Sequence, residues 1–203
     1  MGGTFAAPSV SIAVGTVEIA KDYLLYFILP LWIAAGIVDW FCHRHARIDA
    51  NAGPKESLIH LLMMGEAGIA ILVGLFFTVN SAVILLMLAA WALHEVTTMW
   101  DLIYANAERE VNAIEQRVHD FLGTLPLLVL SFILVIHWGQ FLAIFGLGDE
   151  QADWSLTPRS LDVSPVYFWG LMAAMALNGL IYLEELLRGL RYRSSRRLYT
   201  TGS

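Results

Sequence analysis

The sequence predicts an all-α integral membrane protein, built as a bundle of about five transmembrane helices. Of its 203 residues, 58% are apolar and only 15% are charged, and the mean hydropathy is +0.63. Soluble globular domains carry about 25% charged residues, so these values exclude an ordinary soluble domain. The single cysteine, Cys42, cannot form an internal disulfide, which excludes a disulfide scaffold.

Five segments are long and apolar enough to cross a bilayer, which takes about 20 residues. We expect spans over residues 23–41, 58–79, 82–105, 111–145 and 166–187. Asn80 and Ser81 form a minimal turn between the second and third spans, so these two helices should be antiparallel neighbours. Pro30 and Pro126 lie inside the first and fourth spans, where a helical bundle tolerates proline.

The two ends of the chain lie outside these spans. Residues 1–20 are expected to form a flexible or interfacial lead-in, because their first part lacks the positive charges and the continuous apolar core of a signal peptide. Residues 188–203 contain five arginines and are expected to form a basic cytoplasmic tail that favours anionic lipid headgroups. The whole chain is therefore expected to be one membrane domain.

The positive charges predict the orientation of the bundle. Of the 12 Lys and Arg residues, only Lys21 and Arg159 fall on one side of the expected spans. Because Lys and Arg concentrate on the cytoplasmic side, we expect the N-terminus outside and the C-terminus inside. The expected location is the bacterial inner membrane.

Ionisable side chains gather in the cytoplasmic half of the expected bundle, where they are energetically costly and mark function by default. An acid followed four residues later by a histidine occurs three times: Asp39–His43, Glu56–His60 and Glu115–His119. Residues at i and i+4 share a helix face, so each pair can direct a carboxylate and an imidazole into one site.

Three further groups lie at related depths. His94 and Asp101 are seven residues apart and share a helix face, and Glu66 lies well inside the second span, away from any helix end. At about 1.5 Å of rise per residue, all these groups fall roughly one to three turns inside the membrane boundary. Consecutive helices are thus expected to bring acids and histidines together.

Carboxylates and imidazoles from facing helices hold pairs of metal ions in known helical bundles. We therefore expect two divalent metal ions, with Fe favoured and Zn or Mn as alternatives, because hard oxygen ligands and imidazoles suit these metals. The expected metal ligands are Asp39, His43, Glu56, His60, Glu66, His94, Asp101, Glu115 and His119.

The leading functional hypothesis is a metal-dependent membrane oxidoreductase, in which a lipidic or hydrophobic substrate reacts at the cytoplasmic side of the bilayer. The chain has no nucleotide or flavin motif, so this hypothesis requires an external electron donor. Membrane lipids are the other expected partners. Nucleic acid is not expected, because the sequence has no basic patch interleaved with aromatic residues.

Three alternatives remain open at the level of sequence. A zinc-dependent intramembrane hydrolase would use some of the same ligands, with Glu66 or Glu95 as the catalytic general base. A b-type haem electron carrier would take axial ligands from His60, His94 or His119. Acid–histidine chains also serve as proton or metal-ion pathways.

This layout resembles the membrane-bound di-metal oxygenases, namely the alkane hydroxylases, fatty-acid hydroxylases and desaturases. The resemblance covers Asp39 to His119 and implies a di-iron centre. The histidine boxes of those families are absent, and the ratio of acids to histidines is closer to that of soluble ferritin-like di-iron proteins. The run Arg109-Glu110-Val111, with Glu115-Gln116 and His119, is also similar to a family of small bacterial multi-pass membrane proteins of no assigned activity.

Overall fold

The computed structural model is helical and contains five helices long and apolar enough to cross a membrane, as the sequence predicts. It describes residues 8–200, with side chains described over residues 15–195. The elements are α1 (Pro8–Tyr23), the π-helix η1 (Leu24–Ile28), α2 (Leu29–Ala46), α3 (Pro54–Phe76), α4 (Ser81–Glu108), α5 (Ala113–Ile136), α6 (Trp138–Ile144) and α7 (Pro165–Thr200). Large apolar side chains such as Ile69 and Val135 point outward, as expected for helices that face lipid.

The first span is longer than the expected range 23–41, because α1, η1 and α2 follow one another without a break. The π-helical turn directly precedes Pro30, which lies in the first turn of α2, where its missing N–H is tolerated. The lead-in expected to be flexible or interfacial is helical from Pro8 onward, and residues 1–7 lie outside the described part of the chain. At its other end, α2 stops at Arg47, which adopts the left-handed conformation with φ 53°.

The span expected over residues 111–145 is interrupted. The helix α5 accommodates Pro126 but ends at Ile136, and His137 turns the chain into the short helix α6. The turn is held by Gln140, whose side-chain oxygen accepts from the Ser81 backbone N–H at 3.2 Å and whose backbone oxygen accepts from the Ser81 hydroxyl at 2.8 Å. These bonds join α6 to the start of α4. The residues expected as a basic tail continue α7 as helix to Thr200.

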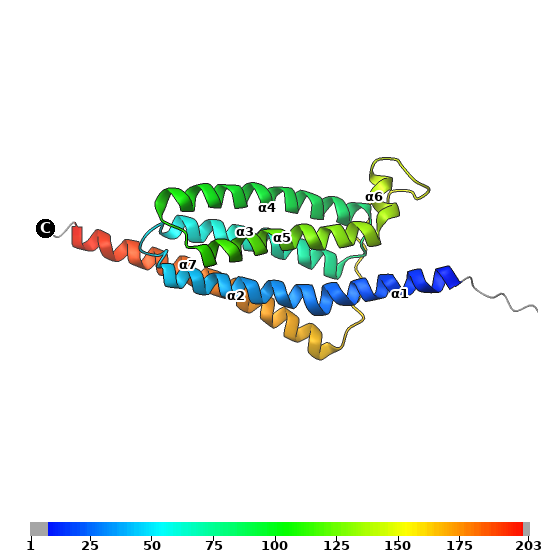
Figure 1. Ribbon diagram of the computed structural model, residues 1–203, viewed down its shortest axis with the longest axis horizontal. Coiled ribbons are helices and arrows are strands. Elements are labelled where there is room, and N and C mark those ends of the chain that lie inside the picture. The colour runs from blue at the N-terminus through cyan, green and yellow to red at the C-terminus, as the bar shows by residue number, and fades with distance from the viewer. Residues whose placement is uncertain (1–7, 201–203) are drawn as a thin grey trace, which may run out of the picture.

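The ends of five helices lie together at one end of the bundle. Helix α3 packs along α4 and α7, and α2 packs along α5 and α7. The C-terminal ends of α2, α4 and α7 and the N-terminal ends of α3 and α5 share one end of the bundle, at the left of Figure 1. The opposite end is held by apolar packing around Val83, Ile84 and Leu130. We call the first of these the polar end.

Helices α2 and α7 approach each other closely near the polar end. A Cβ atom added to Gly36 would lie 2.8 Å from Asn178 Nδ2, so only glycine permits this approach. One turn further along α7, the Tyr182 hydroxyl lies 3.1 Å from the Gly36 carbonyl oxygen. This contact places Tyr182 beside Asp39.

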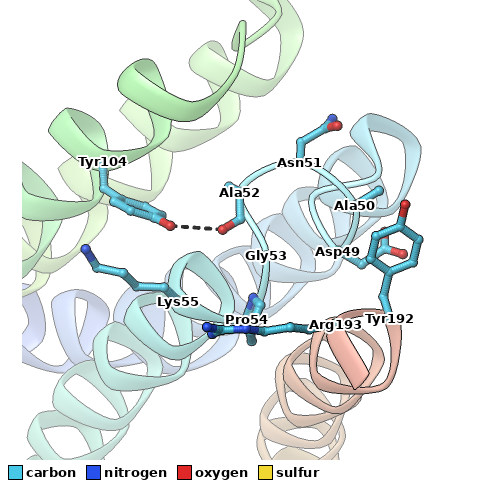
Figure 2. A pocket seen from close by; sticks show the side chains of 10 residues that line it. All are labelled: Asp49, Ala50, Asn51, Ala52, Gly53, Pro54, Lys55, Tyr104, Tyr192 and Arg193. Carbon is cyan, nitrogen blue, oxygen red and sulfur yellow. Dashed lines mark hydrogen bonds between the residues drawn. The ribbon is translucent and has the colours of Figure 1, made fainter. Parts of the chain in front are cut away.

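The loop of residues 47–53 covers the polar end. Together with Tyr104 on α4 and Arg193 on α7, it lines a surface pocket of about 510 Å³ (Figure 2). The Tyr104 hydroxyl on α4 donates a hydrogen bond of 2.9 Å to the Ala52 carbonyl oxygen, and Lys55 Nζ lies 4.2 Å from the centroid of the Tyr104 ring. Gly53, with φ 76°, turns the chain directly into α3. The loop of residues 47–53 thereby leads into the first turn of α3, which carries Glu56.

Candidate metal centre

Five helices bring acids and histidines into one buried group at the polar end. We call it the histidine–carboxylate cluster. Its members are Asp39 and His43 on α2, Glu56 and His60 on α3, Asp101 on α4, Glu115 and His119 on α5, and Glu185 on α7. All of them are buried except His119, which is 20% exposed.

Glu185 joins two histidines of the cluster. His43 Nδ1 lies 3.0 Å from one oxygen of Glu185, and His60 Nδ1 lies 2.9 Å from the other. The two imidazole rings are stacked, with centroids 4.2 Å apart and an angle of 14° between their planes. When each Nδ1–H donates to the carboxylate, a neutral ring carries its free lone pair on Nε2. Both rings then present Nε2 as a ligand atom, side by side.

His43 Nε2 faces a first set of ligand atoms. It lies 3.1 Å from His119 Nε2, 3.4 Å from Asp39 Oδ2 and 3.8 Å from Glu115 Oε1. Asp39 Oδ1 is in turn 3.0 Å from His119 Nε2. Asp39, His43 and His119 can each offer an atom within 4.8 Å of the other two, a separation at which one metal ion can bind all three.

His60 Nε2 faces a second set. It lies 3.3 Å from Asp101 Oδ1 and 3.9 Å from Glu56 Oε1. His43, His60 and Glu185 also offer atoms within 4.8 Å of one another, in which case Glu185 is a ligand rather than a hydrogen-bond acceptor. The cluster therefore contains ligand atoms around two neighbouring positions.

Several of these atoms have no hydrogen-bond partner. Asp39 Oδ1, His60 Nε2 and Asp101 Oδ1 are buried and unpaired, although other polar atoms lie at hydrogen-bonding distance. Most buried polar atoms in proteins are hydrogen-bonded, because an unpaired one is unfavourable by about 1–3 kcal/mol. A metal cation is one group that can satisfy several lone pairs that converge on one position.

The net negative charge of the cluster also favours the binding of cations. Arg109 donates from Nε to Glu56 Oε1 at 3.1 Å and from Nη1 to Glu115 Oε2 at 3.1 Å. Burial alone would lower the pKa of the Arg109 guanidinium, but its hydrogen bonds to Glu115 and Glu56 raise it, so Arg109 stays charged. Five carboxylates and this one guanidinium leave four negative charges when the histidines are neutral. Two divalent cations would balance them.

Tyr182 holds one ligand in place. Its hydroxyl lies 3.0 Å from Asp39 Oδ2 and is buried, so its proton can fix the orientation of that carboxylate. Hydrogen bonds of this kind orient metal-binding side chains and tune their affinity. Tyr182 and Glu185 are three residues apart and therefore share the face of α7 that contacts the cluster.

Seven of the nine expected ligands are brought together by the fold, and two are not. The seven are Asp39, His43, Glu56, His60, Asp101, Glu115 and His119. Glu66 and His94 form a separate pair on α3 and α4, with 3.5 Å between Glu66 Oε2 and His94 Nδ1. Glu66 follows His60 by six residues, which corresponds to about 9 Å along the helix. Glu95 is exposed and is not part of the cluster.

Sequence reasoning missed the contribution of α7. Glu185 adjoins a run of arginines, which made neutralisation of surface charge a sufficient explanation for it. A sharper signal was available, because Asn178, Tyr182 and Glu185 follow one another at spacings of four and three residues where the apolar part of α7 ends. All three are buried, and each contacts α2. Such a polar stripe indicates a face turned into the bundle.

A cavity of about 600 Å³ between the helices adjoins the cluster and is partly open, since Glu95 and Leu102 on its wall are exposed. Asp39, His60, Asp101, His119 and Tyr182 line it at the polar end. The remaining wall is largely apolar and comes from α2, α3, α4, α5 and α7, with residues such as Leu29, Ile33, Met63, Leu122 and Met175. The ligand atoms of the cluster thus face an apolar space within the membrane-spanning helices.

Replacing Glu185 by glutamine is expected to lower the metal affinity about 10- to 100-fold. A glutamine amide has only one oxygen, so at this position it can accept from His43 or from His60 but not from both. Glu184→Gln is the matched control, because Glu184 is 44% exposed and bonds to Arg44 and Trp40 outside the cluster. Titration against a metal chelator measures both affinities, and equal losses in the two variants would contradict the role assigned to Glu185.

Comparisons with known proteins give no independent indication of function. The chain matches no family model, and no curated protein or solved structure is similar to it.

Proposed function

We propose that this protein is a metal-dependent integral membrane oxidoreductase, with two metal ions in the histidine–carboxylate cluster and a hydrophobic substrate in the adjoining cavity. One observation carries the proposal: Glu185 holds the stacked rings of His43 and His60 by Nδ1, so that His60 Nε2 faces the unpaired Oδ1 of Asp101 and His43 Nε2 faces the carboxylates of Asp39 and Glu115. In the orientation inferred from the positive charges, this site lies at the cytoplasmic side of a bacterial inner membrane.

The ligand types favour iron. Three imidazoles and four carboxylates, from Asp39, Glu56, Asp101 and Glu115, surround the two positions, and the only cysteine is not among them. Such a hard ligand set suits Fe or Mn, with Zn as an alternative, and disfavours an iron–sulfur cluster. Bound iron would supply redox chemistry, and its electrons would come from an external donor.

The residues of the chain have distinct tasks in this proposal. Arg109 neutralises part of the negative charge of Glu56 and Glu115 on the side away from the cavity. Tyr182 and Glu185 orient Asp39 and the two stacked imidazoles. The apolar cavity wall keeps bulk water from the reacting groups and admits a substrate that is itself apolar.

One observation supports the alternative of a zinc-dependent hydrolase. Glu95 lines the same cavity, so a zinc-dependent hydrolase could use it as a general base. The haem alternative fits the site less well. It took axial ligands from His60, His94 or His119, and the His43 side chain contacts both His60, with ring centroids 4.2 Å apart, and His119, with 3.1 Å between the Nε2 atoms, so that a porphyrin has no space between those two rings.

Elemental analysis of the detergent-purified protein, together with its optical spectrum, tests the proposal. We expect about two Fe or Mn ions per chain and no Soret band, because the cluster contains two sets of ligands. Zinc alone would favour the hydrolase, and iron with a Soret band would mean haem. Absence of metal after reconstitution would overturn the proposal. His137→Ala is the control, since His137 lies at the opposite end of the bundle and should leave the metal content unchanged.

A further inference from the structure

Glu66 and His94 form a second polar site, which we call the deep pair. Both side chains are buried within membrane-spanning helices, and neither Glu66 Oε2 nor His94 Nδ1 has a hydrogen-bond partner. The two atoms are 3.5 Å apart. The other oxygen of Glu66 accepts a hydrogen bond of 2.8 Å from the Thr97 hydroxyl. An acid and a histidine at this depth are energetically costly and require a function.

A purely structural clamp between α3 and α4 does not explain the deep pair. The Thr97–Glu66 hydrogen bond already links the two helices, and it does so without His94. A third metal site does not explain the deep pair either. Thr97 donates a hydrogen bond to one oxygen of Glu66, and the pair offers only two ligand residues. His94 instead lines the 600 Å³ cavity. Its Nδ1 faces Glu66, which leaves Nε2 as the ring nitrogen available to a ligand there.

The residues that line the rest of the cavity indicate what kind of ligand could bind His94 Nε2. Leu29, Ile33, Ile71 and Met172 line it from three helices, so most of the ligand must be apolar. Three glycines leave the space open: Gly68 on α3, Gly123 on α5 and Gly179 on α7. A Cβ atom at any of them would meet no atom within 4 Å. The cavity therefore has room for an apolar chain between His94 and the polar groups of the cluster.

We propose that His94, oriented by Glu66, binds the hydroxyl group of an amphiphile whose long apolar chain occupies the cavity. The Glu66 carboxylate, 3.5 Å from Nδ1, favours the imidazole that carries its proton on Nδ1, and this form accepts a hydrogen bond at Nε2. A hydroxyl group is the donor that an apolar ligand of this kind carries. An ether or a hydrocarbon of the same shape cannot donate, so it would cover His94 Nε2 without giving it a hydrogen bond.

The deep pair also sets the position of the ligand relative to the cluster. His94, Thr98 and Asp101 follow one another along the face of α4 that lines the cavity. The seven residues from His94 to Asp101 correspond to about 10 Å. If the proposed oxidoreductase function holds, a hydroxyl bound at His94 places a carbon about 10 Å along the chain beside the metal ligands.

Binding of an alcohol and of its methyl ether by the full-length protein tests this inference. The probes are 9,10-dibromooctadecan-1-ol and its methyl ether, which quench tryptophan fluorescence; Trp32 lines the cavity, and Trp32→Phe identifies its signal. We expect the wild type to bind the alcohol about tenfold more tightly than the ether, the effect of one buried hydrogen bond. In His94→Leu the two dissociation constants should become equal, and His94→Gln, which keeps an acceptor, should retain part of the preference.

Glycine variants separate the cavity from the deep pair. Gly68→Leu should weaken binding of both probes, because its side chain fills the cavity, whereas Gly65→Leu on the exposed face of α3 should change neither. A wild type without preference for the alcohol, or a preference that survives in His94→Leu, would overturn the inference.

Metal content distinguishes this inference from the proposed oxidoreductase function. Loss of metal in His94→Leu would assign His94 to the metal centre, and a protein that binds no metal but prefers the alcohol would overturn the oxidoreductase alone.

Discussion

The His43→Ala variant is expected to lose metal from both positions of the cluster, so that its content falls from about two ions per chain to below one. His43 belongs to both groups of ligand residues, one with Asp39 and His119 and one with His60 and Glu185. It also stacks on the His60 ring, whose orientation it helps to fix. Removing any other histidine of the cluster disturbs one set of contacts directly, whereas removing His43 disturbs both.

His45→Ala is the matched control for this variant. His45 is the same residue type on the same helix, but it is exposed, while His43 is fully buried. Elemental analysis should therefore find the full metal content in His45→Ala, and circular dichroism should find both variants folded. Equal metal contents in the two variants would show that the buried rings do not bind metal and would remove the basis of the proposed centre.

The sequence predicted the bundle and most of the cluster for the same physical reason. Apolar runs of about 20 residues have one stable arrangement in a bilayer, and acids placed four residues before histidines on such helices must face inward. The three pairs that begin at Asp39, Glu56 and Glu115 do meet. Depth along each helix was thus a good guide to which helices share a site.

Depth alone could not distinguish the cluster from the deep pair. Glu66 and His94 lie deeper by six and seven residues than their neighbours His60 and Asp101, and only the packing of α3 on α4 shows that they pair with each other. The break of α5 at His137 depends on Gln140 and its bonds to Ser81, far away in the sequence. Contacts of this range leave no local pattern.

The sequence did not distinguish Arg109 from Arg117, because the positive-inside rule predicts arginines in any loop on the cytoplasmic side. In the structure the Arg109 side chain is only 3% exposed and lies between two fully buried carboxylates. Nη2 contacts both Glu56 and Glu115, and Asn112 donates a further hydrogen bond of 3.1 Å to Glu115. The loop between α4 and α5 is therefore part of the cluster rather than a passive connection.

Replacing Arg109 by methionine is expected to destabilise the metal-free protein by about 3–5 kcal/mol, because two buried carboxylates then face each other without a positive charge. A loss of that size lowers the unfolding midpoint by roughly 10 °C in a chain of this length. Added Fe²⁺ or Mn²⁺ should restore much of the loss, since the proposed ions supply charge to the same two carboxylates. The stabilisation by metal is thus expected to be larger in Arg109→Met than in the wild type.

Thermal unfolding in detergent, with and without added metal, measures these effects. Arg117→Met is the control, because Arg117 is exposed and should change neither the midpoint nor its response to metal. Adding Glu115→Gln to Arg109→Met removes one of the two opposed charges and should recover part of the stability. If the midpoint of Arg109→Met falls without responding to metal, Glu56 and Glu115 form a structural ion pair with Arg109 and are not ligands. The second metal position would then lack Glu56, and Asp101 and His60 would have to hold that ion with fewer partners than a stable site requires.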